Sequence, residues 1–394
     1  MDKALLIIIL IFYCPAALWL FLYGINNYYM IYLFLRKVSK ETSGNQEFLK
    51  QFWLDHSNDM LPKVTTQLPV YNERHVVERL IKAVVNIDYP KELHEIQVLD
   101  DSNDETRDIV STLVNKYSAR GFNIKHIVRD NRDGFKAGAL NLGMEKAEGE
   151  FLAIFDADFV PDKDFLYDTI PFFYERPKVA IVQTRWGHIN RNYSLLTIAQ
   201  SIGMDGHFII EQGARTWNGL YMNFNGTAGV WRREAIIDSG GWNFDTLTED
   251  LDLSYRAQLK GWKTKFLFDV VAPSELPVDI NAYKSQQHRW AKGSIQTAKK
   301  VLPQVFKTND SLIKKVEAFI HLNQYMVHPM MIILALLSFP LILLLKVQMS
   351  NMSVSLTMII LIFLISMGAF APTFLYIVAQ KKGYKDWLKR CMFI

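Results

Sequence analysis

Two aspartates that follow a strongly apolar run are the residues of this sequence best placed for chemistry. Asp156 and Asp158 close the segment FLAIFDAD, residues 151–158. Side chains alternate along an extended chain, so both carboxylates are expected to point to the same side. Two carboxylates at a strand end suit a divalent cation that holds phosphate oxygens. The apolar flanks favour this metal site over a pair of solvated surface acids, because unpaired buried charge is costly.

A second group of acids lies in NFDTLTEDLDLSYRAQLKGW, residues 243–262. Thr248 is a plausible N-cap, with Glu249, Asp250 and Asp252 in the first helical turn, where acids are favoured without any function. A carboxylate fixed at a helix tip can also take the proton from an attacking hydroxyl. We predict that Asp250 is such a general base, with Glu249 beside it in the catalytic group.

Two strand ends carry polar residues that could bind a nucleotide. Pro69 and Glu73 lie in QLPVYNER, where a strand turns into a helix, and Asp101 lies in LDDSND. A carboxylate at such a tip can accept hydrogen bonds from a base edge or a ribose hydroxyl. An ordinary turn at the first site and helix capping at the second remain alternatives.

A lysine and a glycine-rich loop supply two weaker signals. Lys136, in RDGFKAGALNLGM, precedes a predicted helix start, where a cation and free N–H groups suit a diphosphate. The spacing differs from that of a P-loop. Asn225, Gly226 and Thr227 form a turn in WNGLYMNFNGTAGVWRREAI, which either serves packing or lines an acceptor site.

The segment SQQHRWAKGS combines a cation with an aromatic ring. Arg289 can bind phosphate through two parallel hydrogen bonds. Trp290 offers a flat apolar face to a sugar ring, although an interfacial tryptophan beside a membrane is the alternative. Gln286 stands one helical turn before both.

The elements that must position these residues alternate between strand-like and helix-like patterns. This alternation predicts βαβ units and a mostly parallel, Rossmann-like α/β sheet. Ligands bind beyond the carboxyl ends of such strands, where the polar residues above lie. The strand-like runs cover residues 64–70, 95–100, 124–128, 151–158 and 179–183, and the helical stretches cover 76–85, 106–117 and 137–146.

Three apolar stretches are long enough to cross a membrane: residues 4–35, 326–345 and 354–379. Basic residues follow the first and the third, which by the positive-inside rule places the region between the first and second spans in the cytoplasm. We expect an integral protein of a plasma or inner membrane, or of a eukaryotic Golgi membrane.

The 394 residues are 50% hydrophobic and 21% charged, which indicates a soluble domain joined to membrane helices. The net charge of +4 forms no basic stripe, so no nucleic-acid partner is expected. Only two cysteines are present, which suits a reducing compartment. We expect a first span at 1–36, a catalytic domain at 37–283, interfacial amphipathic helices at 284–325 that include the QxxRW segment, two spans at 326–380 and a truncated basic tail at 381–394.

These motifs, in this order, resemble the processive family 2 glycosyltransferases, the superfamily of cellulose, chitin and hyaluronan synthases. The decisive series is Asp101 in LDD, the aspartates of DAD, Thr248-Glu249-Asp250 and QxxRW. Within the superfamily, FKAGALNLGM, QTRWGHINRNYSLL, FNGTAGVWR and QQHRW look closest to the cellulose-synthase-like mannan and glucomannan synthases and their bacterial relatives. The family usually carries more membrane helices after QxxRW than this sequence has.

The resemblance implies a GT-A domain that uses Mg²⁺ or Mn²⁺ to transfer a hexose from a nucleotide-diphosphate sugar, UDP-glucose or GDP-mannose, to a growing β-linked glycan. It assigns Asp158 to the metal and Asp250 to the base. An alternative is transfer of one sugar to a lipid or lipid phosphate. A transporter is disfavoured, because the acids lie outside the spans. We expect the donor to contact Pro69, Glu73, Asp101, Lys136, Asp156, Gln286 and Arg289. Asp156 is also expected to bind the metal. We expect the acceptor to contact Trp290, Asn225, Gly226 and Thr227.

Overall fold

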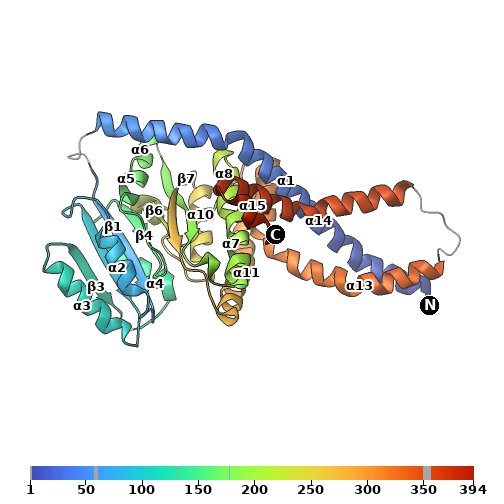
Figure 1. Cartoon of the computed structure of the whole chain (residues 1–394), viewed down its shortest axis with the longest axis horizontal. Coiled ribbons are helices and arrows are strands. Elements are labelled where there is room, and N and C mark those ends of the chain that lie inside the picture. The colour runs from blue at the N-terminus through green and yellow to red at the C-terminus, as the bar shows by residue number, and fades with distance from the viewer. Residues whose placement is uncertain (1, 57–60, 130, 177, 349–355) are drawn as a thin grey trace.

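A computed structural model describes the chain except for residues 1, 57–60, 130, 177 and 349–355, and except for the side chains of 2–3 and 345–367. It consists of an α/β domain and a long helical arm (Figure 1). The arm carries the N-terminus at its far end, and the C-terminus lies where the arm meets the domain.

A seven-stranded, mostly parallel sheet forms the centre of the α/β domain, as predicted. The strand order is β3-β2-β1-β4-β6-β5-β7, and only β6 runs antiparallel to its neighbours. The strands are β1 (Val64–Val70), β2 (His94–Asp100), β3 (Asn123–Val128), β4 (Phe151–Ile154), β5 (Val179–His188), β6 (Gly229–Arg232) and β7 (Lys263–Ser274).

The strands are apolar because both faces of the sheet are buried. On β4, Phe151 and Ala153 face one hydrophobic cluster, and Leu152 and Ile154 face the other. Helices supply the remainder of both clusters, an arrangement that requires near-continuous apolar strands. The helices of the domain are α2 (Val77–Val85), α3 (Thr106–Ser118), α4 (Phe135–Lys146), α5 (Phe165–Thr169), α6 (Phe172–Glu175), α7 (Leu195–Asp205), α8 (Gln212–Trp217), α9 (Arg233–Asp238) and α10 (Glu249–Leu259).

Shorter helical turns and two further helices complete the domain. Helices α11 and α12 pack against α10 through a cluster that includes Tyr255, Val301 and Ala318. Their bounds are α11 (Ile280–Lys307) and α12 (Leu312–Leu322), with 3₁₀ turns η2 (Arg191–Tyr193) and η4 (Gln324–Met326) and a π-helix η3 (Gly206–Glu211).

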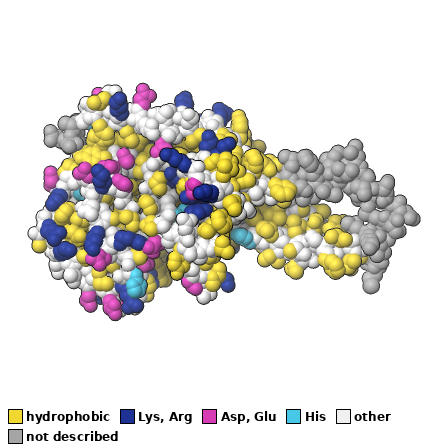
Figure 2. Space-filling view, viewed as in Figure 1, with side chains coloured by type: hydrophobic (Ala, Val, Ile, Leu, Met, Phe, Trp, Pro, Cys, Tyr) yellow, Lys and Arg dark blue, Asp and Glu magenta, His cyan; other side chains and the backbone are white. Residues whose placement is uncertain are grey.

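The arm consists of α1 (Asp2–Asp55), α13 (Val327–Gln348) and α14 (Leu356–Gly383), and a short helix α15 (Trp387–Cys391) follows it. Two of the described helical stretches, Ala4–Asp55 and Gln324–Leu344, are long and apolar enough to cross a membrane. Figure 2 shows charged side chains over the α/β domain and mostly hydrophobic ones along the described part of the arm. The third predicted span coincides with α14, but its first two residues, 354 and 355, lie outside the described residues.

The helix of the first span is much longer than predicted. It continues past Arg36 to Asp55 and lies along the domain, where the ring centroids of Phe48 and Phe172 are 5.1 Å apart. The part of α1 after Arg36 therefore runs from the arm onto the α/β domain.

Three local predictions were wrong or incomplete. Strand β4 ends at Ile154, so Asp156 and Asp158 lie in a turn and not on an extended strand. Strands β6 and β7 were not anticipated. Thr248 is at the N-cap of α10 as predicted, but its hydroxyl makes no capping bond and lies 3.2 Å from the Thr297 hydroxyl instead.

Candidate active site

The two aspartates of the DAD motif lie in a tight turn at the end of β4. The Phe159 amide donates to the Asp156 carbonyl at 3.1 Å, which closes the turn, and the Asp156 amide donates to Thr227 Oγ1 at 2.8 Å. Burial, the Asp156 charge and the Glu73 charge raise the pKa of Asp158 to about 7. The two carboxylates are therefore close enough to repel one another. A turn, and not the alternation of side chains along a strand, brings them together.

Lys136 reaches this turn from the start of α4. Gly134 before it has φ +70°, a conformation that favours glycine. The Lys136 ammonium forms an ion pair with Asp156 and donates to the Gly226 carbonyl at 2.9 Å. Burial opposes its charge, but the carboxylates of Asp156, Glu249 and Asp250 outweigh burial and raise the pKa of Lys136. The lysine is thus a fixed cation among acids.

Asp250 and Glu249 approach the same place from the first turn of α10. A Cβ on Gly226 would lie 3.0 Å from Asp250 Oδ2 and 3.3 Å from Lys136 Nζ, so both groups lie beside this glycine. Burial and the Glu249 charge raise the pKa of Asp250 to about 7, and burial raises that of Glu249. Residues separated by about 100 positions in sequence thus converge at one loop.

Helix α11 places the QxxRW segment beside α10. A Cβ on Gly293 would lie 2.9 Å from the Thr248 amide nitrogen, so the two backbones almost touch. Lys300, two turns later, pairs with the buried Asp252 at 3.0 Å. The Asp252 carboxylate therefore has a structural role.

Two QxxRW residues lie on the same side of α11 as Gly293: Trp290 one turn before it and Gln286 two turns before it. Gln286, Trp290, Gly293 and Thr297 recur at helical spacing, which places them on one side of the helix. The Arg289 charge lowers the pKa of Glu249 against the effect of burial, so this guanidinium also lies near the acids. Gln286 and Trp290 are half-buried, and Arg289 is exposed.

Asp101 is already engaged by a residue that the sequence analysis missed. Arg129, at the end of β3, donates to both Asp101 carboxylate oxygens, and its Nε is 2.7 Å from Oδ1. Arg132 lies 3.2 Å from the centroid of the exposed Tyr71 ring. Arg129 directly follows β3, as Asp101 directly follows β2, so a polar residue at a strand end is the sequence signal for both.

Pro69 and Glu73 lie at the carboxyl end of β1, as expected. Pro69 is half-buried in the strand, level with Leu99 of β2. Burial and the charges of Asp156 and Asp104 raise the pKa of Glu73, which places its carboxyl near the DAD turn. Their predicted contact with the nucleotide stays a prediction.

Two further residues, which the sequence analysis missed, form hydrogen bonds with the Asn225-Gly226-Thr227 loop. Gln183 accepts from the Asn225 amide at 3.0 Å and donates to the Thr227 carbonyl at 3.2 Å. His207 of the π-helix lies 3.0 Å from the Asn225 side-chain oxygen. The loop fixes Lys136 and Asp156, and its predicted contact with an acceptor stays a prediction. Gln183 is a buried polar residue at the end of an apolar run, a visible but non-specific signal.

The chemistry of the DAD turn fits a divalent cation. Asp156 and Asp158 offer hard oxygen ligands, and their mutual repulsion would be relieved by a cation. Among the described residues no group of three or more His, Cys, Asp or Glu could hold a metal alone. Phosphate oxygens and water would complete the coordination, as is usual for Mg²⁺.

Two family profiles match consecutive parts of the chain. Residues 67–239 match the family described as Glycosyl transferase family 2, and residues 233–393 match Cellulose synthase. The first match contains DAD and the second contains TED and QxxRW. The chain belongs to family 2 of the glycosyltransferases, within the cellulose synthase superfamily. The chain therefore carries the motifs of this family on the elements described above.

Plant enzymes of the family are similar to this glycosyltransferase. It is 44% identical over 259 residues to glucomannan 4-beta-mannosyltransferase 7 of Arabidopsis thaliana, a match that covers 64% of this chain and 47% of that one. It is also 44% identical over 275 residues to glucomannan 4-beta-mannosyltransferase 1 of Cyamopsis tetragonoloba, with coverage of 69% and 52%. The chain thus spans about half the length of the curated relatives that it matches.

A solved structure has the same fold. The mannosyltransferase PcManGT of Pyrobaculum calidifontis, in complex with GDP-Man and Mn²⁺, is 19% identical and superposes with a TM-score of 0.52 over 92% of this chain and 95% of that one. The GT-A expectation for the fold class is confirmed.

Proposed function

We propose that this glycosyltransferase transfers mannose from GDP-mannose, with inversion, to the end of a growing β-1,4-linked mannan or glucomannan. The identity to glucomannan 4-beta-mannosyltransferases supports mannose as the sugar and the 4-position as the linkage. We further propose that α1, α13 and α14 anchor the enzyme in a membrane with the α/β domain on the cytoplasmic side.

The observation that carries this proposal is the meeting of three elements at Gly226. The Asp250 carboxylate and the Lys136 ammonium both lie beside this glycine, and Lys136 also pairs with Asp156. A carboxylate with a raised pKa, adjacent to a site with the charges for a diphosphate, is suited to accept a proton during an in-line displacement.

In the proposed reaction, the Asp250 carboxylate takes the proton of the acceptor hydroxyl. The hydroxyl oxygen forms a bond to the anomeric carbon as the bond to the diphosphate oxygen breaks, so an α-linked donor yields a β-linked product. Trp290 supports the acceptor sugar, and Arg289 and Lys136 stabilise the departing GDP. A divalent cation held by Asp156 and Asp158 would offset the remaining negative charge of the GDP.

A product analysis tests the proposal. Membranes that contain the full-length protein are incubated with labelled GDP-mannose, UDP-glucose or other nucleotide sugars, plus Mg²⁺ or Mn²⁺. We expect label from GDP-mannose in a ladder of long products that an endo-β-1,4-mannanase shortens. EDTA should reduce incorporation at least tenfold, and added Mn²⁺ should restore it.

Two outcomes would contradict the proposal. A single mannose on a product that partitions into organic solvent would support the alternative of a lipid acceptor. Exclusive incorporation from UDP-glucose would replace mannose by glucose while leaving the site intact.

A further inference from the structure

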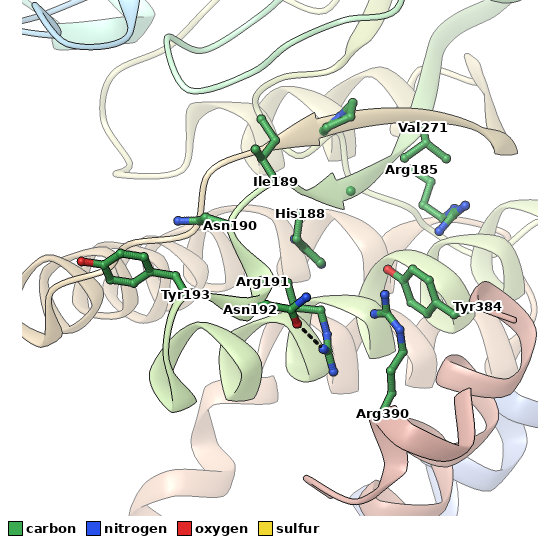
Figure 3. A pocket seen from close by; sticks show the side chains of 12 residues that line it. Arg185, His188, Ile189, Asn190, Arg191, Asn192, Tyr193, Val271, Tyr384 and Arg390 are labelled. Atoms are coloured by element: carbon green, nitrogen blue, oxygen red, sulfur yellow. Dashed lines mark hydrogen bonds between the residues drawn. The ribbon is translucent and has the colours of Figure 1, made fainter. Parts of the chain in front are cut away.

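A pocket of about 420 Å³ lies where the end of α14 meets the α/β domain, and it contains none of the residues assigned above to donor or acceptor. Its walls come from β5, η2, β7, Tyr384 and α15 (Figure 3). Three arginines from three elements line it: Arg185 of β5, Arg191 of η2 and Arg390 of α15. Its volume is within the range of small-ligand sites.

Arg191 carries hydrogen-bond donors that the described residues leave unused. Its side chain is buried, with a relative exposure of 9% for the residue, and Nη1 donates to the Asn192 side-chain oxygen at 2.9 Å. Nε and Nη2 are buried and have no partner among the described residues. Burial and the nearby Arg390 charge lower the pKa of Arg191. Buried cationic donors without an acceptor are costly, so an anion at this position would stabilise the protein.

The acids near the pocket are committed to other partners. Asp205 accepts from the Tyr384 hydroxyl at 2.7 Å and from Gln380 at 2.9 Å. Asp386 accepts from Arg390 Nε at 2.8 Å, while Arg390 Nη1 has no partner among the described residues. Arg191 Nε and Nη2 and Arg390 Nη1, from two different elements, are therefore available to one ligand.

The pocket lies at the end of the helical arm. Helix α14 ends at Gly383, one residue before Tyr384, and exposed Lys381 and Lys382 precede that end. Basic residues at the end of an apolar helix stand at the level of anionic headgroups when the helix crosses a bilayer. Arginine is the preferred partner of phosphate because its planar fork matches two phosphate oxygens.

We propose that this pocket binds a phosphate group, carried either by an anionic phospholipid headgroup or by a soluble phosphate. Arg191 and Arg390 bind the phosphate oxygens, and Arg185 adds positive charge at the opposite wall. This pocket is separate from the donor site. The proposal depends on how the arm meets the α/β domain and does not depend on which sugar is transferred.

The test measures the thermal unfolding midpoint of the purified, delipidated full-length protein in detergent. One arm adds phosphatidylglycerol, with phosphatidylcholine as reference. The other arm adds inorganic phosphate, with chloride at equal ionic strength as reference. The variants are Arg191→Gln and Asn192→Asp, the second of which keeps the bond to Arg191 while cancelling its charge. Lys146→Gln is the matched control, because it removes one exposed charge on α4, outside the pocket and the arm.

We expect a concentration-dependent rise of the midpoint in at least one arm. Its apparent Kd should increase at least tenfold in both pocket variants and stay within twofold in Lys146→Gln. A response to phosphatidylglycerol alone identifies the lipid as the source, and a response to inorganic phosphate identifies a soluble ligand. No response in either arm, or an unchanged Kd in Asn192→Asp, would overturn the proposal. Either result leaves the sugar-transfer proposal untouched.

Discussion

At the scale of single residues, the candidate site is a group of carboxylates that the fold brings together despite their repulsion. Asp156, Asp158, Glu249 and Asp250 have one common cation, Lys136, and burial and mutual repulsion raise the pKa values of Asp158, Glu249 and Asp250. Such a group lowers the stability of the protein when donor and metal are absent, because each raised pKa makes ionisation of the folded state costly.

Asp250→Asn should therefore stabilise the protein at alkaline pH. The folded pKa of Asp250, about 7, lies above its ordinary value of 3.8, so its contribution to the free energy of unfolding falls as the pH rises from about 4 to about 7. Without donor and divalent cation, we expect the variant to melt about 2–4 °C higher than the wild type at pH 8. The difference should vanish near pH 4. Equal midpoints at pH 8 would contradict the electrostatic description.

The motifs predicted which residues lie together in the folded protein. They did not predict the hydrogen-bond partners of those residues. Asp156, Asp158 and Asp250 were found because acids at strand ends and helix tips are conspicuous in an apolar context. The pairing of Asp101 with Arg129 depends on the β2–β3 register, and the contact of Asn225 with His207 depends on a π-helix. Neither of these has a sequence pattern of its own.

At the scale of elements, the approach of α11 to α10 decides where QxxRW lies. Gly293 has no side chain, which allows the start of α10 to come within contact distance. Prediction of elements from sequence succeeded for strands that are long, apolar and bounded by turns. It failed for β6, which has four residues inside a glycine-rich stretch, and for β7, which carries the charged residues Lys263, Lys265 and Asp269.

Gly293→Ala should lower both activity and stability. The new methyl group would collide with the side chain and the backbone nitrogen of Thr248 and push Arg289 and Trp290 away from the acids. Such overpacking costs about 1–3 kcal/mol. We expect kcat to fall at least tenfold and the melting midpoint to fall by several degrees. Gly203→Ala in α7 is the matched control, because no atom lies within 4 Å of the added Cβ. Equal behaviour of the two variants would show that the contact is unimportant.

At the scale of the whole molecule, α1 joins the arm to the catalytic domain. Its first part packs against α14, and its second part lies on the sheet domain through Phe48 and Trp53. Within the arm, a Cβ on Gly24 would lie 2.7 Å from the Cα of Gly368, so the two helices touch through their backbones. Small residues are the usual means of such close packing in membranes. The sequence indicated the spans but not this contact.

Gly24→Ala should loosen the arm. The methyl group would collide with the backbone of α14, so we expect a lower melting midpoint in detergent, by at least 3 °C, with loss of protein on extraction. Gly44→Ala, in the same helix, has open space around the added Cβ and should be neutral or slightly stabilising, because alanine favours helix over glycine. A stable Gly24→Ala protein would argue against tight packing of α1 on α14.

The most direct test of the central claim, that Asp250 removes the proton from the acceptor beside a bound donor, is a comparison of Asp250→Asn with the wild type in two assays. Turnover of labelled GDP-mannose into polymer should fall at least 100-fold, since a general base contributes about 10²–10⁴-fold. Binding of GDP-mannose, measured by equilibrium titration with Mn²⁺, should stay within threefold. Near-normal turnover of the variant, or loss of donor binding with it, would contradict the account.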